Sequence, residues 1–120
     1  MPTAPHDTEY YLETARELAT RVAANVDRIE AGRQLPTELA NEIADSGFFR
    51  LLVPRSLGGA ELDHPTFRKI LEIIAAADGS TAWCINQNNV FATDCVRIPE
   101  QTAKEIWGEK RAVVTNGPPT

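Results

Sequence analysis

The chain has 120 residues, of which 42% are hydrophobic and 24% are charged, and its formal net charge is −5. This composition is typical of one small globular domain and excludes an intrinsically disordered chain. The acidic balance also argues against nucleic-acid binding, because the sequence has no basic stripe that could neutralise phosphates.

Targeting and metal-binding signals are missing from the sequence. The N-terminal residues MPTAPHDTEYY do not place a basic segment before an apolar one, so they are not a secretory signal. The longest apolar run, residues 73–77, is too short to span a membrane. On one helix, Cys84 and Cys95 would lie roughly 16 Å apart, too far for a disulfide. We expect reduced core thiols in a cytoplasmic protein. His6 and His64 are isolated, so no metal site is expected.

The first helix is expected over residues 8–31, where apolar residues recur at alternating spacings of three and four. The stripe consists of Tyr11, Ala15, Leu18, Val22, Val26 and Ile29. Gly32 suits the position after the end of this helix. Pro36 is expected in the first turn of a second helix, which Gly47 ends.

Residues 48–61, FFRLLVPRSLGGAE, break the helical pattern and predict an ordered loop that crosses the bundle. The residues expected to be buried in it are Phe48, Leu51, Leu52 and Val53. Its glycine pair lacks the strand-to-helix surroundings of a phosphate-binding loop. Arg50 and Arg55 are interpreted as solvated or salt-bridged surface residues rather than ligands of a phosphate or of CoA.

A third helix is expected to begin at Asp63, which caps it, and to close at Asp78-Gly79. Ser80 is expected to cap a fourth helix over residues 81–96. No charged side chain occurs between Asp78 and Asp94, yet residues 86–89 read NQNN. Buried amides need hydrogen-bond partners, so we expect other chains, domains or ligands to cover this helix.

A short fifth helix is expected to follow Pro99, with Ala103 and Ile106 inside and Gly108 after its end. Residues 111–115, RAVVT, indicate the start of a strand. A single strand cannot satisfy its own backbone groups, so we expect the helical first domain of a longer protein. The predicted fold is all-α, an orthogonal or up-down bundle of about five helices over residues 1–111. Residues 112–120 would begin a truncated middle β-domain.

Several segments, in their order and spacing, resemble the N-terminal domain of the acyl-CoA dehydrogenase superfamily. They are LP at 35–36, GFFR at 47–50, VP at 53–54, LGGAE at 57–61, AAADGSTAW at 75–83 and IWG at 106–108. The DGSTAW form is more similar to the flavin-dependent monooxygenase branch, whose members hydroxylate aromatic or related substrates. NGPPT at 116–120 also resembles the entry to that family's middle β-domain.

The resemblance implies a flavoenzyme with a helical N-terminal domain, a β-barrel-like middle domain and a C-terminal four-helix bundle. Such proteins are usually homotetramers that act on a small molecule, here an acyl-CoA or an aromatic or hydrophobic compound. The flavin, FAD or reduced FMN, would be held mainly by the other two domains, so the chain alone is expected to bind none. The dehydrogenase base would be a carboxylate of the C-terminal part.

The resemblance also assigns the helix matching residues 80–96 to a wall of the substrate and flavin pocket. Its candidate lining residues are Trp83, Gln87, Asn88 and Phe91. Simple core packing competes with this role for Trp83 and Phe91. The four adjacent amides point in different directions, so some must bond to neighbouring backbone or subunits instead. Several hydroxylase relatives carry a histidine near the position of Phe91, and this helix has none. Either an amide such as Gln87 or Asn88 takes the polar role, or the reaction is not hydroxylation.

Two hypotheses of different class follow. In the first, the chain is the N-terminal domain of a flavin-dependent oxidoreductase that performs hydroxylation or acyl-CoA dehydrogenation, and the DGSTAW form favours hydroxylation. In the second, it is a free-standing helical interaction module without activity. The catalytic residues are unknown, because no acid–base pair or nucleophile arrangement can be assembled from this sequence.

Overall fold

The computed structural model describes residues 8–109 and residue 112, and all regular structure in that part is helical. The six α-helices found there are α1 (Thr8–Ala24), α2 (Val26–Gly32), α3 (Thr37–Asp45), α4 (His64–Ala77), α5 (Gly79–Ala92) and α6 (Glu100–Trp107). Two 3-10 turns accompany them, η1 (Arg55–Leu57) and η2 (Thr93–Arg97). The all-α prediction is confirmed, with six helices in place of about five. The strand predicted at 111–115 lies outside the described residues, apart from Ala112.

The single helix predicted over residues 8–31 is wrong, because the chain breaks at Asn25 between α1 and α2. The backbone N–H of Asn25 donates to the carbonyl of Val22, three residues back, at 2.9 Å. Its side-chain amide donates to the carbonyl of Arg21 at 2.8 Å, the acceptor that the backbone N–H uses in a regular helix. The apolar stripe survives the break, since Ala15, Leu18, Val22 and Ile29 are buried.

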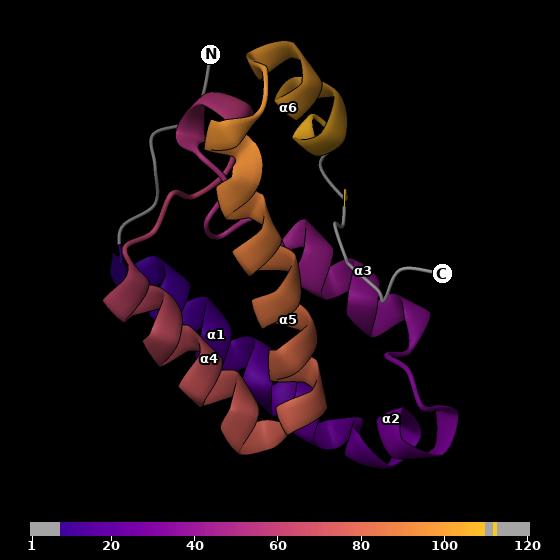
Figure 1. The fold of residues 1–120 in the computed structure, drawn as a ribbon. Helices are drawn as coiled ribbons and strands as arrows, with labels where there is room; N and C mark the ends of the chain where they lie inside the picture. The colour runs from indigo at the N-terminus through magenta and orange to yellow at the C-terminus, as the bar shows by residue number, and fades with distance from the viewer. Residues whose placement is uncertain (1–7, 110–111, 113–120) are drawn as a thin grey trace.

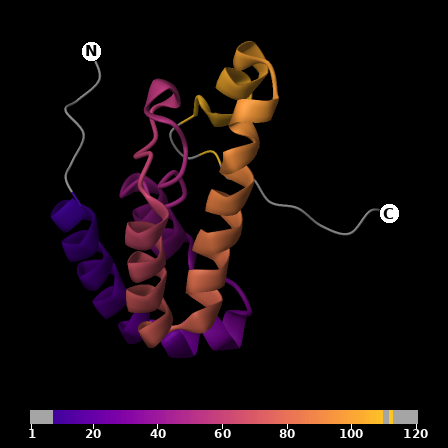
Figure 2. The same ribbon diagram turned by 60° about the vertical axis from the view of Figure 1, so that its left-hand side comes forward.

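Three helices form the body of the domain (Figures 1 and 2). Helices α1 and α4 lie side by side and run in the same direction, and α5 returns antiparallel to them. Helix α2 lies at the end of the molecule where α5 begins, and α6 lies at the end where α5 finishes. No helix of the described residues is long and apolar enough to cross a bilayer.

The core consists of a large cluster and a smaller one. The large cluster gathers apolar side chains from α1 to α5, among them Leu18, Ile43, Phe48, Ile70 and Ile85. The small cluster lies under α6 and consists of Val53, Ala92, Cys95, Ala103 and Trp107. The segment between α3 and α4 therefore contributes to both clusters, with Phe48 in the large one and Val53 in the small one.

The predicted loop over residues 48–61 is confirmed as an ordered segment with a buried first half. Gly47 and Gly58 have φ of 82° and 86°, a region in which glycine is favoured. A Cβ atom at Gly59 would collide with the backbone of Val53. The expected residues Phe48, Leu51, Leu52 and Val53 are all buried.

Arg50 is buried in this segment, so the interpretation of it as a surface residue is wrong. Its side chain is 6% exposed, and desolvation lowers the pKa of its guanidinium. Nη1 donates to the carbonyl of Glu109 at 3.0 Å, and Nη2 donates to the carbonyl of Leu57 at 2.6 Å. Arg50 thereby ties the loop to the chain that leaves α6.

Helix α6 differs from the prediction in which side chains it buries. Ala103 is buried as expected, whereas Ile106 is 40% exposed and Trp107 is 4% exposed. Ala103 and Trp107 are four residues apart and share one face of the helix, which is the face that meets the small cluster.

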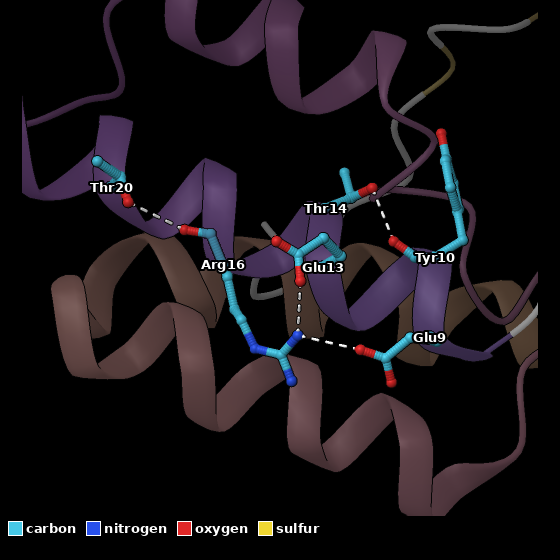
Figure 3. Close-up of polar contacts among 6 residues, drawn as sticks. All are labelled: Glu9, Tyr10, Glu13, Thr14, Arg16 and Thr20. Atoms are coloured by element: carbon cyan, nitrogen blue, oxygen red, sulfur yellow. Dashed lines mark hydrogen bonds and ion pairs between the residues drawn. The ribbon is translucent and has the colours of Figure 1, made fainter.

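Charged side chains on the outer surface connect neighbouring turns and helices. Arg16 lies between Glu9 and Glu13, with N–O distances of 3.2 Å and 2.9 Å (Figure 3). Arg21 of α1 pairs with Glu42 of α3. These groups are exposed, and such pairs contribute little to stability individually.

Candidate functional site

Asp78 fixes the start of α5. One oxygen of its carboxylate accepts from the backbone N–H of Thr81 at 2.9 Å and from the hydroxyl of Thr81 at 2.7 Å. A carboxylate at this position also interacts favourably with the positive end of the helix dipole. The prediction that Ser80 caps this helix is wrong, because Ser80 lies inside the helix and is exposed.

One side of α5 packs into the core and the other is open to solvent. The buried residues are Thr81, Ala82, Ile85, Asn88, Asn89 and Ala92. On the other side, Trp83 is 62% exposed and Val90 is 44% exposed. Figure 1 shows α5 at the front of the molecule with no other helix drawn over it. A tryptophan and a valine in this position present apolar surface that the described residues do not cover.

Three of the four residues predicted to line a pocket lie in one row along α5, and the fourth, Asn88, is buried towards the core. Trp83, Gln87 and Phe91 are spaced by four residues, which places them in one row along a helix. Gln87 and Phe91 are half-buried, and Asn88, next to the row, is buried. We call the row of Trp83, Gln87 and Phe91 the outward face of α5.

A second feature, the α4–α5 groove, runs beside that face. It consists of two hollows, of about 690 Å³ and 390 Å³, which share Arg68, Leu71 and Asn86. The larger hollow is also lined by Leu52, His64, Pro65, Phe67, Val90 and Thr93. The smaller one is also lined by Glu72, Ala75, Gly79, Ala82 and Trp83. Trp83 thus belongs to both features, whereas Gln87, Asn88 and Phe91 line neither hollow.

Asn86 and Val90, which line the groove, were not among the residues predicted to line a pocket. They are four residues apart on α5, in a row that begins at Ala82, and this row meets α4. The spacing could have identified the row, but only the packed structure shows that Arg68 and Leu71 lie across from it. The walls are mostly apolar, and Arg68 pairs with Glu72 at 3.3 Å on the exposed rim.

The described residues offer little for proton transfer or covalent chemistry. They include no cluster of three or more histidine, cysteine or acidic residues that could hold a metal ion. Cys84 is exposed rather than a core thiol, and partial desolvation, followed by the charge of Asp78, raises the pKa of its thiol. A raised pKa keeps the thiol protonated and weakly nucleophilic. Cys95 is buried, as predicted. The outward face of α5 itself carries no titratable side chain, because its residues are Trp83, Gln87 and Phe91.

Comparison with known proteins gives a consistent family and two kinds of relative. Residues 5–112 match the family model described as acyl-CoA dehydrogenase, N-terminal domain. The chain is 28% identical over 103 residues to HsaA of Mycobacterium tuberculosis, the oxygenase subunit of a flavin-dependent monooxygenase. That similarity covers 86% of this chain and 26% of HsaA. It is 26% identical over 96 residues to the oxygenase component of p-hydroxyphenylacetate 3-hydroxylase of Acinetobacter baumannii. That similarity covers 80% of this chain and 23% of the hydroxylase component.

A third relative is the 3-(aryl)acrylate reductase of Clostridium sporogenes, with 26% identity over 110 residues. That similarity covers 85% of this chain and 29% of the reductase. The chain spans about a quarter of the length of these three relatives.

Proposed function

The chain belongs to the acyl-CoA dehydrogenase family as an N-terminal domain, and on that premise we propose that it forms one wall of the substrate and flavin pocket of a flavin-dependent oxidoreductase. The observation that carries this proposal is the outward face of α5. Trp83 is 62% exposed on a helix without a charged side chain between Asp78 and Asp94. Apolar surface of this kind is typical of a site that a ligand or a second domain covers.

The residues of this face fit a neutral, planar, conjugated ring. Trp83 and Phe91 can contact the faces or edges of such a ring, and Gln87 offers both a donor and an acceptor. Asn88, which is buried beside this row, has a side-chain oxygen without a hydrogen-bond donor in the described part of the chain. When bound, a flavin would supply the electron- or oxygen-transfer chemistry. The chain's own residues would bind and orient the ring system and exclude water from one side of it.

Hydroxylation of an aromatic or related compound is the reaction that we favour. Its support is the DGSTAW form together with relatives that are named as a flavin-dependent monooxygenase and a hydroxylase component. Reduction or dehydrogenation of an acyl compound is the second candidate, and the relative named as an arylacrylate reductase supports it. Because no histidine stands at Phe91, the polar role in hydroxylation would fall to an amide such as Gln87 or Asn88.

We further propose that the whole protein continues beyond this domain. Residues 1–111 would be the helical domain, residues 112–120 would begin a middle β-domain, and a helical C-terminal domain would follow. The whole protein would be a cytoplasmic homotetramer, with FAD or FMN held mainly outside this chain. The supporting fact is that the chain spans about a quarter of each relative named above.

The test is an expressed protein extended beyond Thr120 by the coding sequence that follows it. It is expected to show flavin absorbance or to bind reduced flavin tightly, and Trp83→Ala is expected to weaken ligand binding. Ile106→Ala is the matched control, because Ile106 is 40% exposed but lies on α6. Formation of a hydroxylated product with oxygen consumption separates hydroxylation from acyl reduction or dehydrogenation. A protein without either flavin signal refutes the proposal and favours a free-standing helical interaction module.

A further inference from the structure

The polar groups shared by the two hollows lie at the centre of the α4–α5 groove, between helices that run side by side (Figures 1 and 2). The hollows share Arg68 of α4 and Asn86 of α5, together with the apolar Leu71. Away from this centre the larger hollow is walled mainly by apolar side chains, and the smaller hollow extends to Trp83. We call Arg68 and Asn86 the polar waist of the groove.

Asn86 is a half-buried amide without a partner of its own. Its side chain makes no hydrogen bond with any described residue, and neither of its polar atoms is sealed from solvent. Asn89, three residues later, shows the contrast, because its amide is completely buried and makes three hydrogen bonds to backbone groups. The Asn86 side chain therefore adds no hydrogen bond to the described fold, and its N–H groups are accessible to a ligand in the groove.

Arg68 uses only part of its guanidinium within the fold. Nε donates to Oε1 of Glu72 at 3.3 Å, whereas Nη1 and Nη2 make no hydrogen bond with any described residue. The Arg68 side chain is 82% exposed, so a ligand in the groove can reach these two nitrogens. A guanidinium donates hydrogen bonds and accepts none, so its partner must be an acceptor. The polar waist thus presents donors from both helices of the groove.

The dimensions of the groove fit a small elongated molecule. Its hollows of about 690 Å³ and 390 Å³ lie in the size range of small-molecule sites. Along α4 the lining runs from His64 to Ala75, a distance of roughly 16 Å along a helix. An apolar helix in the same place would cover the donors of the waist without supplying acceptors, because its own carbonyl groups are already bonded.

We propose that the α4–α5 groove binds an elongated apolar compound that places a hydrogen-bond-acceptor oxygen at the polar waist. This inference rests on the proposed function, in which α5 is a wall of the ligand pocket, and it names the class of substrate. Trp83 connects the two, because it belongs both to the outward face of α5 and to the smaller hollow. The acceptor oxygen belongs to a neutral carbonyl or to a carboxylate, and the donors of the waist suit both.

The first experiment compares three probes that carry the same two phenyl rings, in the extended protein that tests the proposed function. Diphenylmethane has no acceptor between its rings, benzophenone has a neutral carbonyl, and diphenylacetate has a carboxylate. Equilibrium dialysis should show that at least one acceptor probe binds roughly tenfold more tightly than diphenylmethane, the size of one hydrogen bond. The probe with the larger gain identifies the acceptor. If neither binds more tightly than diphenylmethane, the inference is overturned.

Substitutions then test whether this gain arises at the waist. Asn86→Leu and Arg68→Met should each lower the gain by about threefold or more, because each removes donors. The matched controls are Asn41→Leu, a half-buried amide on α3, and Lys69→Met, an exposed cation on α4, and neither residue lines a hollow. Both controls should keep the full gain. A gain that survives both waist substitutions, or that the controls also remove, would contradict the assignment. Circular dichroism checks that each variant is folded.

A photochemical experiment locates the probe directly. Irradiated benzophenone reacts with C–H bonds of the residues around it, and mass spectrometry of the digested protein identifies those residues. Crosslinks are expected in α4 and α5, and an excess of diphenylmethane should suppress them. If no crosslink falls on these helices, another part of the polypeptide or another protein fills the groove, and the inference is overturned.

The outcomes separate this inference from the proposed function, because binding and crosslinking of the probes require no flavin. A protein that binds flavin but shows no gain that depends on the waist refutes the inference and leaves the proposed function in place. A protein without a flavin signal refutes the proposed function. Crosslinks to α4 and α5, together with a gain that depends on the waist, would then still establish the groove as a ligand site.

Discussion

The substitution Asn89→Ala tests how α5 is joined to the segment between α3 and α4. Asn89 Oδ1 accepts from the backbone N–H of Leu52, and Nδ2 donates to the carbonyl of Phe48. The Asn89 side chain is completely buried, so water cannot substitute for either bond without opening the core. Alanine would leave the Leu52 N–H and the Phe48 carbonyl buried without these partners. The carbonyl of Ile85 would keep its backbone helix bond.

The magnitude follows from these two backbone groups. Each unpaired buried group costs about 1–3 kcal/mol, so Asn89→Ala should lower the free energy of unfolding by about 2–6 kcal/mol. The total stability of such a domain is on the order of 5–15 kcal/mol, and the variant would therefore be close to unfolding at elevated temperature.

Urea denaturation followed by far-UV circular dichroism measures this loss. The unfolding midpoint should fall while the slope of free energy against urea stays unchanged, because the surface exposed on unfolding is nearly the same. Gln87→Ala is the matched control, a half-buried amide of the same helix, and should change stability by only about 0.5 kcal/mol. Equal losses for the two variants would refute the reasoning, because the buried amide would then be no more important than a peripheral one.

Three further predictions concern the loop, a helix cap and the buried cation. Gly59→Ala should lower the free energy of unfolding in urea by about 2 kcal/mol or more, because the new Cβ atom would collide with the backbone of Val53. Gly32→Ala is the control and should be close to neutral, because the space around Gly32 is open. The pKa of Asp63 is lowered in the folded chain, mainly because the hydroxyl of Thr66 donates to its carboxylate. The carboxylate therefore stabilises the fold at pH values above its unfolded pKa, near 3.8. That stabilisation is lost as the pH falls through the lower folded pKa. Asp63→Asn should therefore lower the urea midpoint at pH 6 and progressively less below about pH 4; a constant difference would contradict the assignment. Arg50→Lys should cost about 1–3 kcal/mol by the same assay, because an ammonium group cannot bond to both carbonyls that the guanidinium reaches.

The helices themselves could be predicted from the sequence, but some of their ends could not. Apolar spacing predicted the stripe of α1, and Asp63 was correctly predicted as the cap of α4, accepting from Thr66. The break at Asn25 was missed because a side-chain amide competes with the backbone for one carbonyl, which no apolar pattern records. The cap of α5 was placed at Ser80 instead of Asp78 for a similar reason. Both residue types cap helices, and only the backbone conformation selects between them.

Contacts between distant segments were the other source of error. Arg50 meets the carbonyl of Glu109, 59 residues away, so its local sequence indicated an ordinary surface arginine. Ile106 was wrongly placed inside and the burial of Trp107 was not predicted, because the inward side of α6 depends on where the small cluster lies. The uncharged stretch of α5 could be recognised from the sequence. The α4–α5 groove could not, because it depends on how Arg68 and Leu71 lie across from Asn86.

The arrangement of α5 separates the groups that hold the helix from the groups that it presents. Asp78 fixes its start, Ile85 and Ala92 bury its inner side, and Asn89 joins it to the preceding segment. None of these contacts involves Trp83 or the rest of its row. Trp83 is 62% exposed and takes no part in these contacts, so a substitution there is expected to alter ligand binding while the helix stays in place. A pocket wall requires this separation, because residues that contact a ligand can then change without loss of the contacts that hold the helix.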